Sequence, residues 1–135
     1  MVFPNKTKYS KYQKNKISGQ KRNGHILYFG NYGLQAVQAG RVTQFQLEAC
    51  RKFLQKKLKR HGKVWINIFP HWPLTKKSTG IRMGKGKGEV SSWFCRIKKY
   101  SMLFEIQSTS QELAKEALKG ASFKLALPTK LIIKN

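Results

Sequence analysis

The sequence contains no aspartate, and its five glutamates stand against 28 lysines and arginines, so the formal net charge is +23 over 135 residues. With so few carboxylates, two that converge on a pocket for general acid–base catalysis are not expected. The charge excess repels itself unless an anionic partner neutralises it. The composition therefore disfavours an enzyme and predicts a polyanionic partner, either a nucleic acid or an anionic membrane surface.

Other functional groups are also scarce. The two cysteines, Cys50 and Cys95, lie 45 residues apart without a Cys-x-x-Cys pair, so we expect two buried or half-buried thiols and neither zinc nor a disulfide. The histidines, His25, His61 and His71, are not spaced three or four residues apart. We therefore expect no metal site, no catalytic residue and no cofactor. No apolar run approaches 18 residues, and the first 22 residues lack the apolar stretch of a secretory signal.

The length suits one domain, and the 40% hydrophobic residues predict a folded core. The pattern predicts a two-layer α+β sandwich, with two helices packed on a mainly antiparallel sheet. One or two strands are expected in 25–38, and single strands in 63–69, 90–99, 102–107 and 129–133. Helices are expected over 44–60 and 110–122, and a long loop over 70–88. We predict two parts, a basic arm over 1–24 and the domain over 25–135.

The first helix has the clearest signals. Thr43 and Gln46 match a capping box, and Gly62 follows as a candidate left-handed cap. An apolar stripe at helical spacing predicts a core face formed by Phe45, Leu47, Ala49, Cys50, Phe53, Leu54 and Leu58. The opposite face is cationic, with Arg51, Lys52, Lys56, Lys57, Lys59 and Arg60. Thr109 and Glu112 predict a capping box for the second helix. His61 is expected to contact phosphate or to cap the first helix.

Two other segments are strongly basic. The arm has no acidic residue and no apolar period, and its lysines alternate with Tyr9 and Tyr12, so we expect it to be disordered when free and ordered on a polyanion. Residues 82–88 read Arg-Met-Gly-Lys-Gly-Lys-Gly. This spacing matches neither a phosphate-binding P-loop nor a dinucleotide fingerprint. It predicts a thin cationic finger whose glycines approach phosphates closely, against the plainer alternative of a mobile hairpin with solvated lysines.

Together the arm, the helix and the finger favour a nucleic acid over a membrane, because the apolar stripes are needed to cover the sheet. Structured RNA is favoured over DNA, because no DNA-reading helix motif is present. Glu48, Glu112 and Glu116 lie among helical lysines and arginines, and local ion pairing is expected of them.

Several stretches resemble one family along nearly the whole chain, the bacterial-type large-subunit ribosomal protein sixteen. The matching segments are 4–9, 29–34, 39–43, 46–51, 62–66, 82–88 with Trp93, 103–106 and 112–117. The resemblance implies a structural, non-enzymatic protein bound to large-subunit rRNA between the central protuberance and the peptidyl-transferase centre. It further implies help in positioning A-site tRNA, with the finger reaching inward, and neighbouring ribosomal proteins as partners. This chain departs from the family pattern at His71-Trp72, where the family has Asp-Lys, and at Gln107, where it has Asp.

The residues expected to bind RNA are the basic and glycine positions of these segments. They are Lys6, Lys8, Tyr9, Lys11, Lys14, Lys16, Lys21, Arg22, Arg41, Arg51, Lys52, Lys56, Lys59, Arg60, Arg82, Gly84, Lys85, Gly86, Lys87 and Gly88. The alternatives are a free-standing RNA-binding translation or assembly factor and a basic enzyme acting on RNA. A composition rich in residues with AT-rich codons, and poor in acids, favours a mitochondrial ribosome. A plastid or a bacterial cytoplasm is the alternative compartment.

Overall fold

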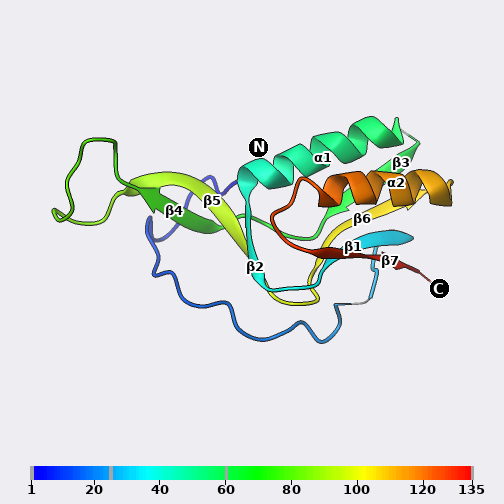
Figure 1. Cartoon of the computed structure of the whole chain (residues 1–135), viewed down its shortest axis with the longest axis horizontal. Coiled ribbons are helices and arrows are strands. Elements are labelled where there is room, and N and C mark those ends of the chain that lie inside the picture. Colours follow the sequence, from blue (N-terminus) through cyan, green and yellow to red (C-terminus); the bar gives the residue numbers. More distant parts are fainter. Residues whose placement is uncertain (1, 25, 60, 135) are drawn as a thin grey trace.

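The computed structural model describes residues 2–24, 26–59 and 61–134. Its elements follow in the order β1 (Tyr32–Ala36), β2 (Gly40–Thr43), α1 (Gln44–Leu58), β3 (Gly62–Ile66), β4 (Trp72–Lys76), β5 (Glu89–Ile97), β6 (Met102–Ser108), α2 (Gln111–Ser122) and β7 (Thr129–Ile133). The two helices lie against antiparallel sheets (Figure 1), which confirms the α+β class. The division into an arm and a domain stays a prediction.

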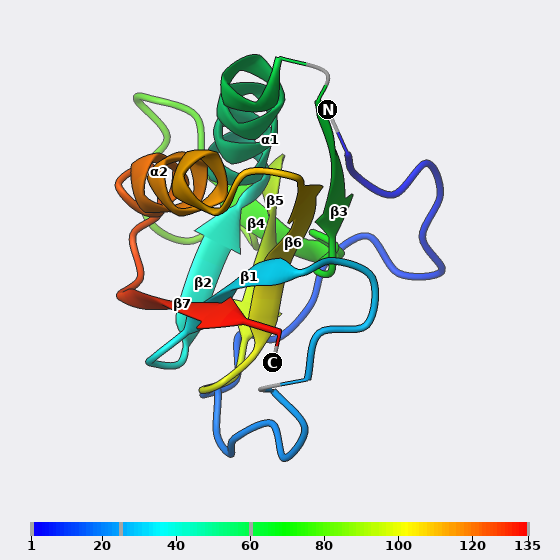
Figure 2. The ribbon, with the colours of Figure 1, turned by 90° about the vertical axis from the view of Figure 1, so that its right-hand side faces the viewer.

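The strands form two sheets where the sequence predicts one. The larger has the order β3-β6-β1-β7, and the smaller has the order β2-β5-β4, with antiparallel pairing throughout. The two sheets are joined by the turn between β5 and β6, where Tyr100 adopts a left-handed φ of 65°. Figure 2 shows both helices on one side of the larger sheet. α2 packs on β1, β6 and β7, whereas α1 packs on α2, on β3 and on the smaller sheet.

Two strands were missed by the sequence prediction, and one region was extended too far. β2 is only four residues long and ends at the residue that caps α1. β4 lies inside the predicted long loop and contains Pro73. Because β4 is an edge strand, a proline there costs the sheet no hydrogen bond with a further strand. Within the predicted strand region 25–38, only β1 forms a strand among the described residues.

The helix ends agree with the sequence at α1 and differ at α2. The Thr43 side chain accepts from the Gln46 backbone N–H at 3.3 Å, and the Gln46 side chain accepts from the Thr43 N–H at 3.0 Å, which confirms the capping box. Lys59, rather than Gly62, takes the left-handed position at the end of α1. The predicted box at Thr109 is wrong, because Ser110 caps α2 by accepting from the Leu113 N–H.

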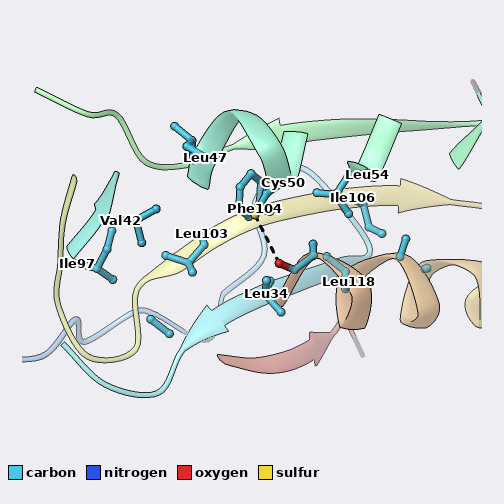
Figure 3. Close-up of a cluster of buried hydrophobic side chains, with 14 of the residues drawn as sticks. Leu34, Val42, Leu47, Cys50, Leu54, Ile97, Leu103, Phe104, Ile106 and Leu118 are labelled. Carbon is cyan, nitrogen blue, oxygen red and sulfur yellow. Dashed lines mark hydrogen bonds between the residues drawn. The ribbon is translucent and has the colours of Figure 1, made fainter. Parts of the chain in front are cut away.

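The core lies between the helices and the sheets (Figure 3). Its fully buried side chains include Leu47, Leu54 and Leu58 of α1, Phe104 and Ile106 of β6, and Leu118 of α2. Val42, Cys95 and Ile97 extend the same cluster into the smaller sheet. Three residues of the predicted core face of α1 are not fully buried. Phe45 and Ala49 are exposed, and Phe53 is half-buried against Gly120 of α2. Phe53 therefore packs between the helices and not between helix and sheet.

Both cysteines are buried, as the sequence predicts. The Cys50 thiol donates to the Ala121 carbonyl at 3.5 Å, so it joins α1 to α2 (Figure 3). Burial raises the pKa of Cys50 to about 11 and that of Cys95 to about 12. Because the thiolate is the reactive form, both side chains behave as small apolar groups at neutral pH.

Glu105 is a carboxylate in the centre of β6, with no exposed surface. It accepts hydrogen bonds from the backbone N–H of Phe29 at 2.7 Å and of Gly30 at 2.9 Å, and from the Asn67 amide at 2.5 Å. Burial alone raises the pKa of Glu105, but these hydrogen bonds to the charged form outweigh it and hold the pKa below the usual 4.5. Through these hydrogen bonds, the Glu105 carboxylate holds the segment before β1 against the larger sheet.

We expect Phe104→Ala to lower the free energy of unfolding by about 3–5 kcal/mol, because it opens a cavity in a fully buried site. Lys52→Ala, on the exposed face of α1, should change it by less than about 0.5 kcal/mol. Urea unfolding measures both. Equal effects of the two substitutions would contradict the packing of α1 and β6.

Glu105→Gln should lower the free energy of unfolding by about 2–4 kcal/mol at neutral pH, because the amide offers one acceptor oxygen to three donors. A carboxyl whose pKa is lowered on folding stabilises the fold above its unfolded pKa, and this stabilisation is lost as the pH falls through the folded pKa. The difference between wild type and variant should therefore shrink in acid below about pH 4.5. A difference that stays constant between pH 7 and pH 3 would contradict this role.

Candidate nucleic-acid interface

The loop between β4 and β5, residues 77–88, extends away from the helices and the larger sheet (Figure 1). The side chains of Arg82, Lys85 and Lys87 are exposed, and Met83 is 94% exposed, so the loop contributes nothing to the core. Gly84 and Gly86 adopt φ values of +96° and +87° with open space where a Cβ would stand. Both glycines are thus required by backbone conformation and not by crowding.

Gly88 has a different role from the other two glycines of the finger. Its φ is not in the left-handed region, but a Cβ here would lie 2.7 Å from the Lys76 carbonyl group. It therefore permits the close approach of the two strands at the base of the hairpin. Gly84 and Gly86 are thus needed for their positive φ, whereas Gly88 is needed for a close backbone contact within the chain itself.

The arm follows the smaller sheet and reaches the base of the finger. At one end, Gln20 forms an isolated bridge with Lys99, and the Lys21 N–H donates to the Lys99 carbonyl at 2.9 Å. Further along, the Arg96 guanidinium of β5 donates to the Lys16 carbonyl at 2.7 Å. Residues 2–24 form no helix and no strand, as the sequence predicts. That the arm is disordered in the free protein stays a prediction.

A reciprocal pair of hydrogen bonds joins the arm to the finger. The Lys11 ammonium donates to the Lys87 carbonyl at 3.2 Å, and the Lys87 ammonium donates to the Tyr12 carbonyl at 2.7 Å. Lys11 also lies 3.5 Å from the Glu89 carboxylate at the start of β5. Two cationic segments that lie more than 70 residues apart in the sequence are therefore held side by side.

An aromatic cluster on the outer face of the smaller sheet supports this arrangement. Trp72 of β4 meets the Tyr12 ring edge-on at a centroid distance of 5.2 Å, and the Arg96 guanidinium lies 4.4 Å from the Trp72 ring centre. Arg41 pairs with Arg96 across β2 and β5, and its guanidinium lies 5.3 Å from the Phe94 ring centre. Such cation–π contacts fix both arginines on this face, and Arg96 also contacts the arm.

Sequence reasoning assigned no role to Trp72 or Arg96. The available signal was the departure at His71-Trp72, where an aromatic residue stands in place of the family's lysine. Tyr12 of the arm is half-buried against Trp72. Tyr9 is 62% exposed and carries the Lys8 ammonium 5.5 Å from its ring centre, so its face toward solvent is accessible.

The other predicted residues fall into two groups. Exposed side chains of the arm are those of Lys6, Lys8, Lys14, Lys16, Lys21 and Arg22. Lys52, Lys56 and Lys59 are exposed on α1, in the helical layer, and share no described hydrogen bond with the arm or the finger. Arg51 is held by a two-point ion pair with Glu48, whose shorter distance is 2.6 Å. Arg60 lies outside the described residues.

Two of the three helical glutamates form ion pairs within the chain. Glu48 pairs with Arg51 as predicted, and the Arg51 hydrogen bond lowers its pKa. Glu116 pairs with Lys57 of α1 at 2.6 Å, across the helices and not within α2. For Glu112 the described contacts include no ion pair. His61 is exposed, and its backbone N–H donates to the Leu58 carbonyl, so the backbone of this residue caps α1.

The arrangement offers exposed cations and accessible backbone. Within residues 2–24, 26–59 and 61–134, no cluster of three histidine, cysteine or acidic side chains could hold a metal ion. Neither described helix is long and apolar enough to cross a membrane. What the arm, the finger and the smaller sheet can do chemically is to neutralise phosphates along an extended polyanion.

Comparison with known proteins identifies the family. The family model described as "Ribosomal protein L16p/L10e" matches residues 4–132. A protein of Kosmotoga olearia named "Large ribosomal subunit protein uL16" is 46% identical over 132 residues, which cover 98% of this chain and 94% of the relative. A protein of the same name from Allorhizobium ampelinum is 44% identical over 132 residues, covering 98% and 96%. These matches confirm the resemblance seen in the sequence: the chain belongs to the ribosomal protein L16p/L10e family.

Proposed function

We propose that this chain is a structural, non-enzymatic protein of the large ribosomal subunit. In this proposal the arm and α1 bind large-subunit rRNA near the peptidyl-transferase centre and the central protuberance, and the finger helps position tRNA in the A site. Family membership supports the ribosomal role, and the two uL16 relatives carry the large subunit in their names. The observation that carries the proposal is a pair of hydrogen bonds, from Lys11 to the Lys87 carbonyl and from Lys87 to the Tyr12 carbonyl. They join the arm to the base of a protruding cationic finger.

The cations of this surface keep their charge for a partner. Lys11, Lys87 and Arg96 donate to backbone carbonyls, which carry no net charge. Only Glu89 among the described residues brings a carboxylate to this surface, and its side chain is 93% exposed at 3.5 Å from Lys11. RNA phosphates would complete the neutralisation, and exposed glycines would allow them to approach the backbone closely.

The compartment belongs to the same proposal. Both named relatives come from bacteria, which supports a bacterial-type ribosome and, among the compartments left open by the sequence, the bacterial cytoplasm. The shortage of acidic residues and the abundance of residues with AT-rich codons favour a mitochondrial ribosome instead. Locating the encoding gene in a nuclear, organellar or bacterial genome decides between them.

Binding to large-subunit rRNA should weaken steeply with salt. Each phosphate contact to a single strand contributes about −0.7 to the slope of log affinity against log salt, so roughly six contacts give a slope of about −4. Lys14→Gln, in the exposed arm, should reduce the slope by about 0.7, whereas Lys115→Gln, exposed on α2, should leave it unchanged. Filter binding over a salt series measures the slope for wild type and for both variants. A salt-independent affinity would rule out a polyanionic partner.

Replacing both Gly84 and Gly86 with alanine should leave the fold intact, because open space surrounds each position. Forcing an L-residue into these φ values costs roughly 1 kcal/mol each, so A-site tRNA affinity should fall by up to about 30-fold. The measurement uses purified ribosomes that carry the variant. Gly19→Ala is the matched control, since Gly19 has a φ of +81° and open space but lies in the arm. If the double variant binds A-site tRNA as tightly as wild type, the finger does not help position the tRNA and is only a mobile hairpin.

A further inference from the structure

We infer that a recess beside the end of β3 holds an unpaired RNA base. It lies apart from the contacts between arm and finger, and it is lined by the segment before β1 together with Ile66, Asn67 and Met102. The inference rests on the proposed RNA-binding function and adds a second kind of contact to it, to a base instead of to phosphates.

The lining of the recess has the chemistry that base recognition needs. Its volume is about 280 Å³, and Tyr28 and Phe29 stand at it with 61% and 60% of their surface exposed. The polar residues Lys21, Asn23 and Asn67 also line the recess. Proteins bind unpaired RNA bases by stacking them on aromatic rings and by hydrogen-bonding their edges. Lys21 would contact the phosphate of the same nucleotide.

The aromatic side of the recess is fixed before any ligand arrives. The buried Glu105 carboxylate accepts from the N–H groups of Phe29 and Gly30, which sets the backbone of this turn. A Cβ at Gly30 would lie 2.5 Å from the Ile106 carbonyl oxygen, so the turn is pressed against β6. The Phe29 ring stacks on Trp65 of β3, with centroids 6.0 Å apart and planes inclined by 19°. Little conformational freedom would be lost when a base stacks here.

The core does not explain why these rings are exposed. Phe29 and Tyr28 are absent from the buried cluster and from the side chains packed against it. The turn is nevertheless held by Glu105, a fully buried carboxylate. A buried carboxylate that fixes the backbone of a turn with two exposed aromatic side chains supports a binding surface more than a packing feature.

The charges around the recess favour RNA over a protein partner. Lys21 lines it, Arg22 is its chain neighbour, and Lys63 shares a face of β3 with Trp65. Among the described residues, Glu105 is the one carboxylate at this site, and its oxygens are already hydrogen-bonded. A nucleotide supplies both a ring for the aromatic side and a negative charge for the lysines.

The experiment compares two ten-nucleotide RNA probes, a uridine oligomer and the same backbone with abasic positions throughout. The double variant Tyr28→Leu with Phe29→Leu should bind the uridine oligomer roughly 5- to 100-fold more weakly than wild type, with the same salt slope. Its affinity for the abasic probe should equal that of wild type. Phe29→Tyr should retain wild-type affinity, which guards against a loss caused by misfolding. Phe123→Leu is the matched control, since Phe123 is 79% exposed at the end of α2.

Equal affinity of the double variant and wild type for the uridine oligomer would overturn the inference that the recess binds a base. It would leave the proposed RNA-binding function intact. Failure of the wild-type chain to bind either probe in a salt-dependent manner would instead contradict the proposed RNA-binding function. Unchanged RNA affinity together with poorer incorporation of the double variant into large subunits would assign the aromatic surface to a neighbouring protein, and this too would overturn the inference.

Discussion

The imbalance between 28 cationic side chains and five carboxylates is the constraint on which the rest of the molecule depends. The glutamates that form ion pairs or hydrogen bonds within the chain hold its parts together, at Glu48 and Glu116 for the helices and at Glu105 for the sheet. The basic segments are instead fastened through backbone carbonyls and aromatic faces, as at Lys87 and Arg96. Such contacts hold a cation in place without cancelling its charge, so the chain can fold while its surface remains attractive to a polyanion.

The smaller sheet shows how this works in detail. Its inner face carries Cys95 and Ile97 into the core, whereas its outer face presents Phe94 and Trp72 to the arm and to two arginines. An aromatic ring attracts a guanidinium without adding negative charge that would compete with phosphates. Trp72 is such an uncharged ring, and it fastens the arm through Tyr12 and Arg96.

The features that could be predicted from the sequence are those that depend on residues close together in the chain. The capping box at Thr43 and the apolar stripe at Leu47, Leu54 and Leu58 are local, and α1 was predicted within two residues of its end. β4 was not predicted, because Pro73 argues against a strand unless the strand is known to lie at the edge of a sheet. The finger's glycines were predicted as exposed and flexible, but Trp72 and Arg96 act through contacts with residues 60 and 80 positions away. Sequence periodicity carries no information about such pairs.

β5 connects stability and function because its two ends lie in different surroundings. The end with Cys95 and Ile97 is buried in the core, and the end with Glu89 emerges at the base of the finger, beside Lys11 of the arm (Figure 1). A strand of nine residues that is anchored at one end positions its other end with little freedom. The direction of the finger is therefore set by the core, whereas the conformation of its tip is set by Gly84 and Gly86. Substitutions at the tip can thus change the exposed surface of the finger without affecting the packing that sets its direction.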